Sequence, residues 1–175
     1  MAIIVAILMA LGGALFWWAR SNPRDALGVA DDALTIARNA PRKLAFRRQT
    51  KGHPAEGIDD PVLAIVTLGN AFLELDDLPT REGRQKLHVL TRRIWRMSEE
   101  EAQECLSLAR WLLEQCGGAD ATLDRVARRL YRLDQGESWA DLEALLAGLG
   151  EDGLSTRQTE AFADLKRILT RPDKG

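Results

Sequence analysis

Acidic side chains gather in two short segments of the chain that share one pattern. LDDLPTREGRQK (75–86) and EDGLSTRQTEAF (151–162) both read Asp-x-Leu-x-Thr-Arg over six of their residues. Carboxylates are the ligands that a hard cation such as Ca²⁺ takes, and Ca²⁺ binds six or more oxygen atoms. Each segment alone supplies too few, so a divalent-cation site requires the two segments to meet in space, with water completing the shell. The candidate ligands are Asp76, Asp77, Glu82, Glu151 and Asp152.

The same pattern also fits a pair of turns between helices. Asp and Gly accept the backbone conformations that a tight corner needs, and a Ser, Thr or Pro then starts the next helix. On this interpretation the following helices begin at Pro79 and Ser155, and Leu78 and Leu154 pack into the core. An Asp near a helix N-terminus is stabilised by the helix dipole without any metal. The residues alone favour the turn.

The remaining reactive side chains form no recognisable catalytic pattern. His53 and His88 are far apart in the sequence, and His88 lies one helical turn before Arg92, which predicts a surface position. Cys105 and Cys116 fall on one predicted helix, roughly 16 Å apart along its axis, which is too far for a disulfide. We expect both to be free thiols. No glycine-rich phosphate loop is present. The sequence therefore predicts no enzymatic activity, no resident cofactor and no small-molecule substrate.

The N-terminus predicts a membrane anchor. Residues 1–18 contain no charged or strongly polar side chain. As a helix they span roughly 27 Å, close to the hydrocarbon thickness of about 30 Å. Trp17 and Trp18 suit the headgroup region, and Arg20 and Arg24 follow. A cleaved signal peptide would need basic residues before the apolar run and small residues at a cleavage site after it, and the sequence has neither.

These features predict a transmembrane helix over residues 1–19. Because the Lys/Arg excess follows the span, the positive-inside rule places the N-terminus outside and the rest in the cytoplasm. The chain is thus expected to be a single-pass protein of the bacterial inner (cytoplasmic) membrane. Small residues recur along one face of the span and predict contact with another helix, with chance spacing as the alternative. They are Ala2, Ala6, Ala10, Gly13 and Ala14.

A basic neck is expected over residues 20–57. Residues 1–52 contain eight Lys/Arg and three Asp/Glu, whereas residues 53–175 contain 16 and 23. A basic segment near a bilayer is attracted to anionic lipid headgroups by about 1 kcal/mol per charge, and a solvated linker helix is the alternative. The acidic balance of the remainder predicts no nucleic-acid binding. The candidate lipid-binding residues are Arg42, Lys43, Arg47, Arg48 and Lys51.

The body, residues 58–172, shows helical periodicity throughout and no alternating strand pattern. It predicts an all-α fold, a compact bundle of about six short helices with an internal duplication. Asp60 and Pro61 suit a helix start. Capping boxes are predicted at Ser98 with Glu101, at Ser155 with Gln158 and, in a weaker form, at Ser138 with Asp141.

The body also resembles the TerB-like family, named for tellurite-resistance proteins. Its signature is a repeated ADG-x-(I/L)-(S/T)-x-x-E corner in an all-helical, duplicated domain. EDGLSTRQTEAFADL resembles it with Leu154 one residue early, and LDDLPTREGRQKL with Asp77 in place of Gly. The resemblance implies corners that bind divalent cations in some relatives, and association with membrane or stress-response assemblies. By position it implicates Asp76, Glu82 and Asp152, whereas Gln158 stands where the family prefers an acid.

Two functions follow as hypotheses. The first is a non-catalytic, membrane-anchored accessory subunit that packs into a larger inner-membrane protein complex, with its helical body on the cytoplasmic side. The anchor, the small-residue stripe and the basic neck point to it. The second is a membrane-tethered module of the tellurite-resistance type that binds Ca²⁺ or a similar ion at the two corners.

Overall fold

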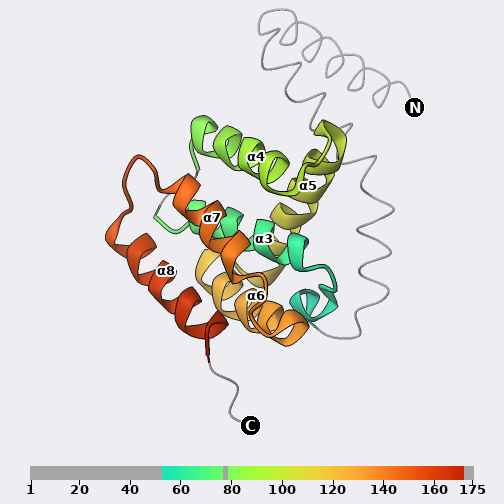
Figure 1. Cartoon of the computed structure of the whole chain (residues 1–175), viewed down its shortest axis with the longest axis vertical. Coiled ribbons are helices and arrows are strands. Elements are labelled where there is room, and N and C mark those ends of the chain that lie inside the picture. The colour runs from blue at the N-terminus through green and yellow to red at the C-terminus, as the bar shows by residue number, and fades with distance from the viewer. Residues whose placement is uncertain (1–52, 77–78, 172–175) are drawn as a thin grey trace, which may run out of the picture. The chain divides into compact units, whose positions relative to one another are not determined.

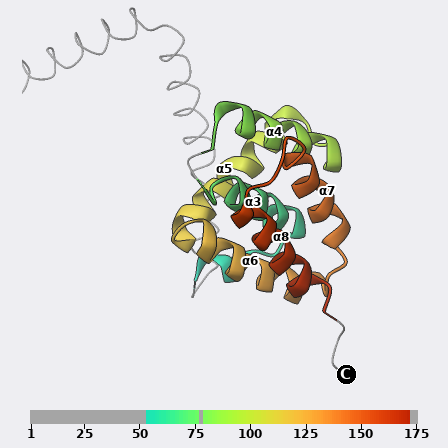
Figure 2. The same cartoon turned by 90° about the vertical axis from the view of Figure 1, so that its left-hand side faces the viewer.

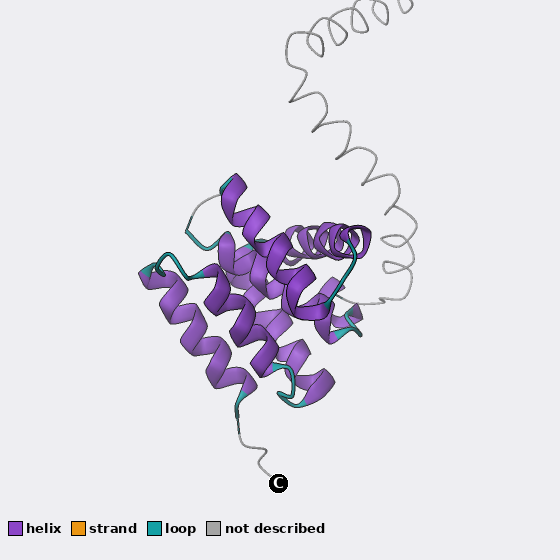
Figure 3. Ribbon diagram, turned by 45° about the horizontal axis from the view of Figure 1, so that its top comes forward, coloured by secondary structure: helices purple, strands orange, loops and turns teal. Residues whose placement is uncertain are grey.

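The computed structural model describes residues 53–76 and 79–171. Within these residues the backbone forms six α-helices and one 3-10 helix, with no strand (Figure 3). The predicted all-α class is therefore confirmed for this part of the chain. In order, the elements are η1 (Pro54–Gly57), α3 (Pro61–Leu73), α4 (Arg81–Trp95), α5 (Glu99–Cys116), α6 (Ala119–Asp134), α7 (Trp139–Leu149) and α8 (Thr156–Leu169).

Helix α3 forms the centre of the bundle. It contacts α4, α5, α6 and α7, and every residue from Leu63 to Phe72 is buried (Figures 1 and 2). A helix that is apolar on all sides has to be enclosed by other elements. Gly69 allows one of them to approach closely, because a Cβ built there would lie 2.8 Å from Leu145 Cδ2 of α7. The continuous apolar stretch of α3 thus determines how the other helices are arranged.

The other helices contribute one apolar face each to the same core. Leu87, Leu112, Leu130, Leu146 and Leu165 come from five different helices, and each is at most 2% exposed. Together with α3 they form one continuous hydrophobic cluster. Burying a leucine side chain contributes about 1.5–3 kcal/mol, so this shared core is what holds the described helices together.

Side-chain caps define most of the helix starts. Asp60 accepts a hydrogen bond from the Val62 backbone N–H at 2.9 Å, directly before Pro61. Both predicted capping boxes, Ser98 with Glu101 and Ser155 with Gln158, are present in full. These caps confirm the local interpretation of the sequence.

The third predicted cap is wrong. Ser138 makes no side-chain cap to α7. Its backbone N–H instead donates to Asp134 Oδ2 at 3.1 Å, and its hydroxyl donates to the same atom. Asp134 also accepts from the Gly136 backbone N–H at 3.0 Å. Because this carboxylate at the end of α6 holds the turn, the Ser138 side chain points back along the chain.

The first described residues pack onto the body. Ala55 and Ile58 are at most 1% exposed, and η1 contacts α5 and α6. Arg129 Nε donates to the Ile58 carbonyl at 2.7 Å, and Arg132 pairs with Glu56 at 2.7 and 2.9 Å. Residues 54–57, which the sequence places in the neck, are therefore in contact with the bundle.

The predicted membrane span, residues 1–19, lies outside the described residues. Among residues 53–76 and 79–171, no helix combines the length and the apolar character that crossing a bilayer requires.

Candidate functional site

Each acidic corner joins a pair of helices. The first connects α3 to α4 and the second connects α7 to α8. The two are out of step by one residue, because α4 begins after an N-cap at Thr80 whereas α8 begins after an N-cap at Ser155. Helix α4 thus starts at Arg81, later than the start at Pro79 that the sequence predicts.

Arg81 and Arg157 occupy the same position in the two repeated segments. Because of the one-residue offset, their side chains have different environments. One residue corresponds to about 100° around a helix. Arg81 is exposed at the start of α4, and no hydrogen bond or ion pair is recorded for it among the described residues. Arg157, its counterpart in the repeat, donates to the Leu75 carbonyl and to both carboxylate oxygens of Asp120, at 3.1 and 3.0 Å.

The start of α8 lies against the end of α3, so the two corners do meet. Gln158 Nε2 donates to the Phe72 carbonyl at 3.3 Å. Helices leave their last carbonyls without intrahelical partners, and Gln158 and Arg157 supply donors at this end of α3. Gln158 also completes its own capping box by accepting from the Ser155 backbone N–H at 3.1 Å. At the end of α3, the contact is thus made by an amide and a guanidinium of α8.

A lysine from α4 pairs with both carboxylates of the second corner. Lys86 Nζ lies 2.8 Å from Asp152 Oδ2 and 3.6 Å from Glu151 Oε2. The hydrogen bond to Asp152, together with the charges of both carboxylates, raises the pKa of Lys86 above its ordinary value of 10.5. A protein cation therefore occupies the position between these two carboxylates and ties α4 to the turn between α7 and α8.

The remaining candidate metal ligands are dispersed. Asp76 and Glu82 are exposed, and Asp77 lies outside the described residues. Glu82 sits in the first turn of α4, where the helix dipole stabilises a carboxylate. Within the described part of the chain, no three His, Cys, Asp or Glu side chains cluster as a metal site would require. Metal binding stays a prediction, because Asp77 belongs to the proposed set.

Leu154 does not pack into the core as predicted. It is 40% exposed and lies over Gly150, where an added Cβ would come within 2.2 Å of Leu154 Cδ2. The left-handed backbone of Gly153, with φ 111°, precedes it and turns the chain outward. Its counterpart Leu78 lies outside the described residues.

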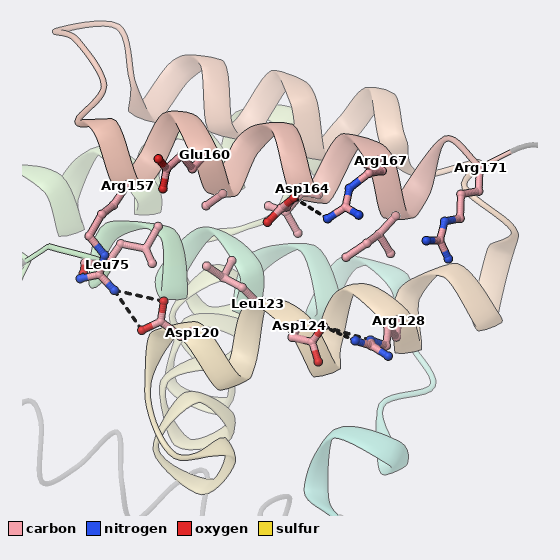
Figure 4. Close-up of a pocket in the computed structure, with 13 residues that line it drawn as sticks. Leu75, Asp120, Leu123, Asp124, Arg128, Arg157, Glu160, Asp164, Arg167 and Arg171 are labelled. Carbon is pink, nitrogen blue, oxygen red and sulfur yellow. Dashed lines mark hydrogen bonds and ion pairs between the residues drawn. The ribbon is translucent and has the colours of Figure 1, made fainter.

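A groove between α6 and α8 was not predicted from the sequence. It has a volume of about 380 Å³, with Leu123, Leu165 and Ile168 among its apolar residues (Figure 4). Four acidic residues and four arginines also line it. Three of the arginines form ion pairs, which are Arg157 with Asp120, Arg128 with Asp124 and Arg167 with Asp164. The i,i+4 and i,i+3 spacing of the last two pairs was the signal available in the sequence.

His88 is less exposed than predicted. Its side chain is 14% exposed, and Nε2 lies 3.1 Å from Glu99 Oε1 without forming a hydrogen bond. Glu99 also pairs with Arg92 at 2.8 Å. Cys105 and Cys116 form no disulfide with each other, as predicted, and Cys116 is buried whereas Cys105 is half-buried. Burial raises the pKa of the Cys116 thiol, which keeps it protonated at neutral pH.

The small-residue stripe from Ala2 to Ala14 and the basic cluster from Arg42 to Lys51 lie outside the described residues. Comparison of the chain with known protein families, with curated proteins and with solved structures finds no match. The TerB-like resemblance therefore stays a prediction that rests on the two corner segments.

Proposed function

We propose that the protein is a non-catalytic accessory subunit, anchored in the inner membrane by residues 1–19 and packed there into a larger protein complex. The observation that carries the proposal is the apolar run of residues 1–18, with its stripe of small residues, ahead of a separate helical body. Small residues let two membrane helices approach closely, which is how such helices associate in lipid. The basic residues after the span place the body on the cytoplasmic side.

The arrangement of the body supports this role. Its long polar side chains tie helices together: Arg157 and Gln158 join α8 to α3, Lys86 joins α4 to the second corner, and Arg132 joins α6 to η1. Contacts between distant segments fix the helices relative to one another. Such a body presents fixed surfaces to a neighbouring subunit, which is what an accessory subunit requires.

Co-purification tests the proposal. The full chain, tagged at its C-terminus, is extracted from membranes in mild detergent and its native size and partners are determined by size-exclusion chromatography and mass spectrometry. We expect a defined complex with other membrane proteins. Ala6→Leu with Ala10→Leu should reduce recovery of the partners, whereas the volume-conserving control Leu8→Ile with Leu11→Ile should not. A protein that migrates alone after extraction contradicts the proposal.

One observation favours metal binding as a second function. A cation site needs both corners, and the start of α8 lies against the end of α3. Lys86 would compete for Glu151 and Asp152, so we expect Lys86→Gln to strengthen Ca²⁺ binding if it occurs. Calorimetric titration of the protein with Ca²⁺, with Asp76→Asn and Asp152→Asn as controls, tests this. Absence of heat, or heat unchanged by both substitutions, ends the metal hypothesis.

A further inference from the structure

Helix α4 carries a charge opposite to that of the rest of the body. Residues 81–96 contain six Arg or Lys and one Glu, a net charge of +5. The other residues from 53 onward contain 10 basic and 22 acidic residues, a net charge of −12. Helix α4 and its C-cap Arg96 thus carry a net positive charge on an otherwise acidic body, and α4 lies at the top of the bundle in Figure 1.

The basic side chains of α4 lie mainly on its outward side. Leu87, Leu90 and Thr91 are buried against the bundle. The opposite side, at the i, i+4, i+8 and i+11 spacing of one helical face, consists of exposed residues, with Val89 47% exposed near the middle, and the exposed Arg96 follows as the left-handed C-cap of the helix. We call this side the α4 face, and it comprises Arg81, Gln85, Val89, Arg92 and Arg96, with Arg93 and Glu82 beside them.

Three arginines of the α4 face have no partner in the described part of the chain. No hydrogen bond or ion pair is recorded there for the side chains of Arg81, Arg93 or Arg96, all of them exposed. Arg128, Arg132, Arg157 and Arg167 on α6 and α8 form ion pairs, whereas the exposed Arg125, Lys166 and Arg171 make none with the described residues. Within residues 53–76 and 79–171, the donors of the guanidinium groups of Arg81, Arg93 and Arg96 are thus unused, and a guanidinium is a planar group that matches phosphate geometry.

Two other basic residues of α4, Lys86 and Arg92, have partners among the described residues. Lys86, on one flank, reaches the second corner. Arg84, on the other flank, is exposed and makes no hydrogen bond or ion pair with the described residues. Arg92 pairs with Glu99 at 2.8 Å and is still 45% exposed.

We propose that the α4 face lies against the anionic phosphates of a lipid bilayer. The inference rests on the proposed function, because the anchor of residues 1–19 would hold the body close to the membrane. The face is also unlike a protein interface, whose fully buried centre is rich in aromatic and other apolar side chains. Its exposed side offers Val89 as the one apolar side chain, with arginines at both ends. Binding to headgroup phosphates requires these positive charges and needs no apolar centre.

The size of the effect follows from the number of free arginines. A basic side chain near an anionic bilayer contributes enough attraction to change an equilibrium about fivefold. Removing Arg81, Arg93 and Arg96 together should therefore weaken docking of the body on the membrane on the order of 100-fold. High salt should weaken it as well, because the contact is exposed and screened.

The experiment uses the full chain reconstituted into vesicles of phosphatidylcholine, with or without phosphatidylglycerol. A fluorophore is attached at Val89→Cys, or at the control site Ala163→Cys on α8, both in a background of Cys105→Ala and Cys116→Ala. Ala163 is exposed, and α8 lies in the lower half of Figure 1, away from the α4 face. A quencher on the lipid headgroup then reports which helix touches the bilayer. In the native-cysteine chain, photo-cross-linking from a lipid headgroup, mapped by mass spectrometry, gives an independent readout.

We expect the label on α4 to be quenched more strongly than the label on α8, only in vesicles that contain phosphatidylglycerol. Arg81→Gln, Arg93→Gln and Arg96→Gln together should abolish the difference. The matched control Arg125→Gln, Lys166→Gln and Arg171→Gln removes the same charge from other exposed positions and should preserve it.

The two proposals fail in different ways. If the chain floats with anionic vesicles but the labels on α4 and α8 are quenched equally, only the α4 proposal is overturned. The α4 face would then be a binding surface for an acidic protein. A chain that floats with neither kind of vesicle contradicts the proposed function and, with it, this inference. Cross-links that fall on α6 or α8 and not on α4 also overturn the assignment of this face.

Discussion

Gln158 offers the sharpest test of how the two corners meet. Its amide makes two different contacts: Oε1 accepts from the Ser155 backbone N–H, and Nε2 donates to the Phe72 carbonyl at the end of α3. Gln158→Ala removes both contacts. Gln158→Glu, which restores the acid preferred by the TerB-like pattern, keeps the acceptor but places a carboxylate oxygen next to the Phe72 carbonyl.

The magnitudes follow from these contacts. Each lost hydrogen bond lowers the free energy of unfolding by about 0.5–1.5 kcal/mol, so Gln158→Ala should cost about 1–3 kcal/mol. Gln158→Glu loses one bond but gains about 0.3–1 kcal/mol from a negative charge near the N-terminus of α8. Because repulsion between the Glu carboxylate and the Phe72 carbonyl opposes that gain, we expect a smaller net loss, between about zero and about 1 kcal/mol at neutral pH. In acid the protonated Glu donates again, and the difference from the parent should shrink.

Urea unfolding of residues 53–175, whose described helices share one hydrophobic core, followed by circular dichroism, measures both effects. At a typical dependence of about 1–3 kcal/mol per molar urea, Gln158→Ala should move the midpoint by roughly 0.5–1 M. Gln85→Ala, an exposed glutamine on α4, is the matched control and should change little. An unchanged midpoint for Gln158→Ala, or a Glu variant more stable than the parent without added metal, would refute the reasoning.

Three further predictions concern the core, the lysine tie and the thiols. Leu145→Ala, at a fully buried position beside α3, should cost about 2–5 kcal/mol in urea unfolding, whereas Leu154→Ala at the exposed corner should cost less than about 1 kcal/mol; equal losses would contradict the assigned core. Because the pKa of Lys86 is raised in the folded state, its ion pairs stabilise the fold below about pH 10.5, and this contribution disappears as the pH rises through the higher folded value. The stability difference between the parent and Lys86→Gln should therefore vanish in alkaline solution. A difference that grows there would exclude the stabilising contact of Lys86 with Glu151 and Asp152. Alkylation of the native protein should modify half-buried Cys105 before buried Cys116, and the reverse order by mass spectrometry would show that α5 is misplaced.

Much of the fold could be predicted from the sequence because its signals are local. A Ser followed three residues later by Glu or Gln determines a helix start by itself, and Ser98 and Ser155 both behave accordingly. The apolar run after Pro61 likewise indicated a buried helix, which is α3.

Predictions for Ser138 and Leu154 failed because neighbouring residues changed the outcome. Ser138 was expected to cap α7, but Asp134 of the preceding helix takes its hydroxyl and backbone N–H. Leu154 was assigned to the core from its neighbours, although the left-handed Gly153 turns the chain outward before it. Neither effect is visible in the residue type at the position itself.

In the candidate site, too, the local motifs could be predicted from the sequence, whereas the contacts between distant residues could not. The sequence identified both corners and stated that a metal site would need them to meet. It did not reveal that Arg157 and Gln158 make the contact between them, or that Lys86 pairs with Glu151 and Asp152. The last of these pairs joins residues 66 positions apart, a separation at which a single sequence carries no pairing signal.

Fractionation of cells that express the full chain tests the central claim most directly. We predict that the mature protein keeps the residues before Trp18, stays in the membrane pellet after alkaline carbonate extraction, and exposes its body to protease only in inverted membrane vesicles. A mature N-terminus beyond Trp18, or release of the protein into the high-speed supernatant, would contradict the account.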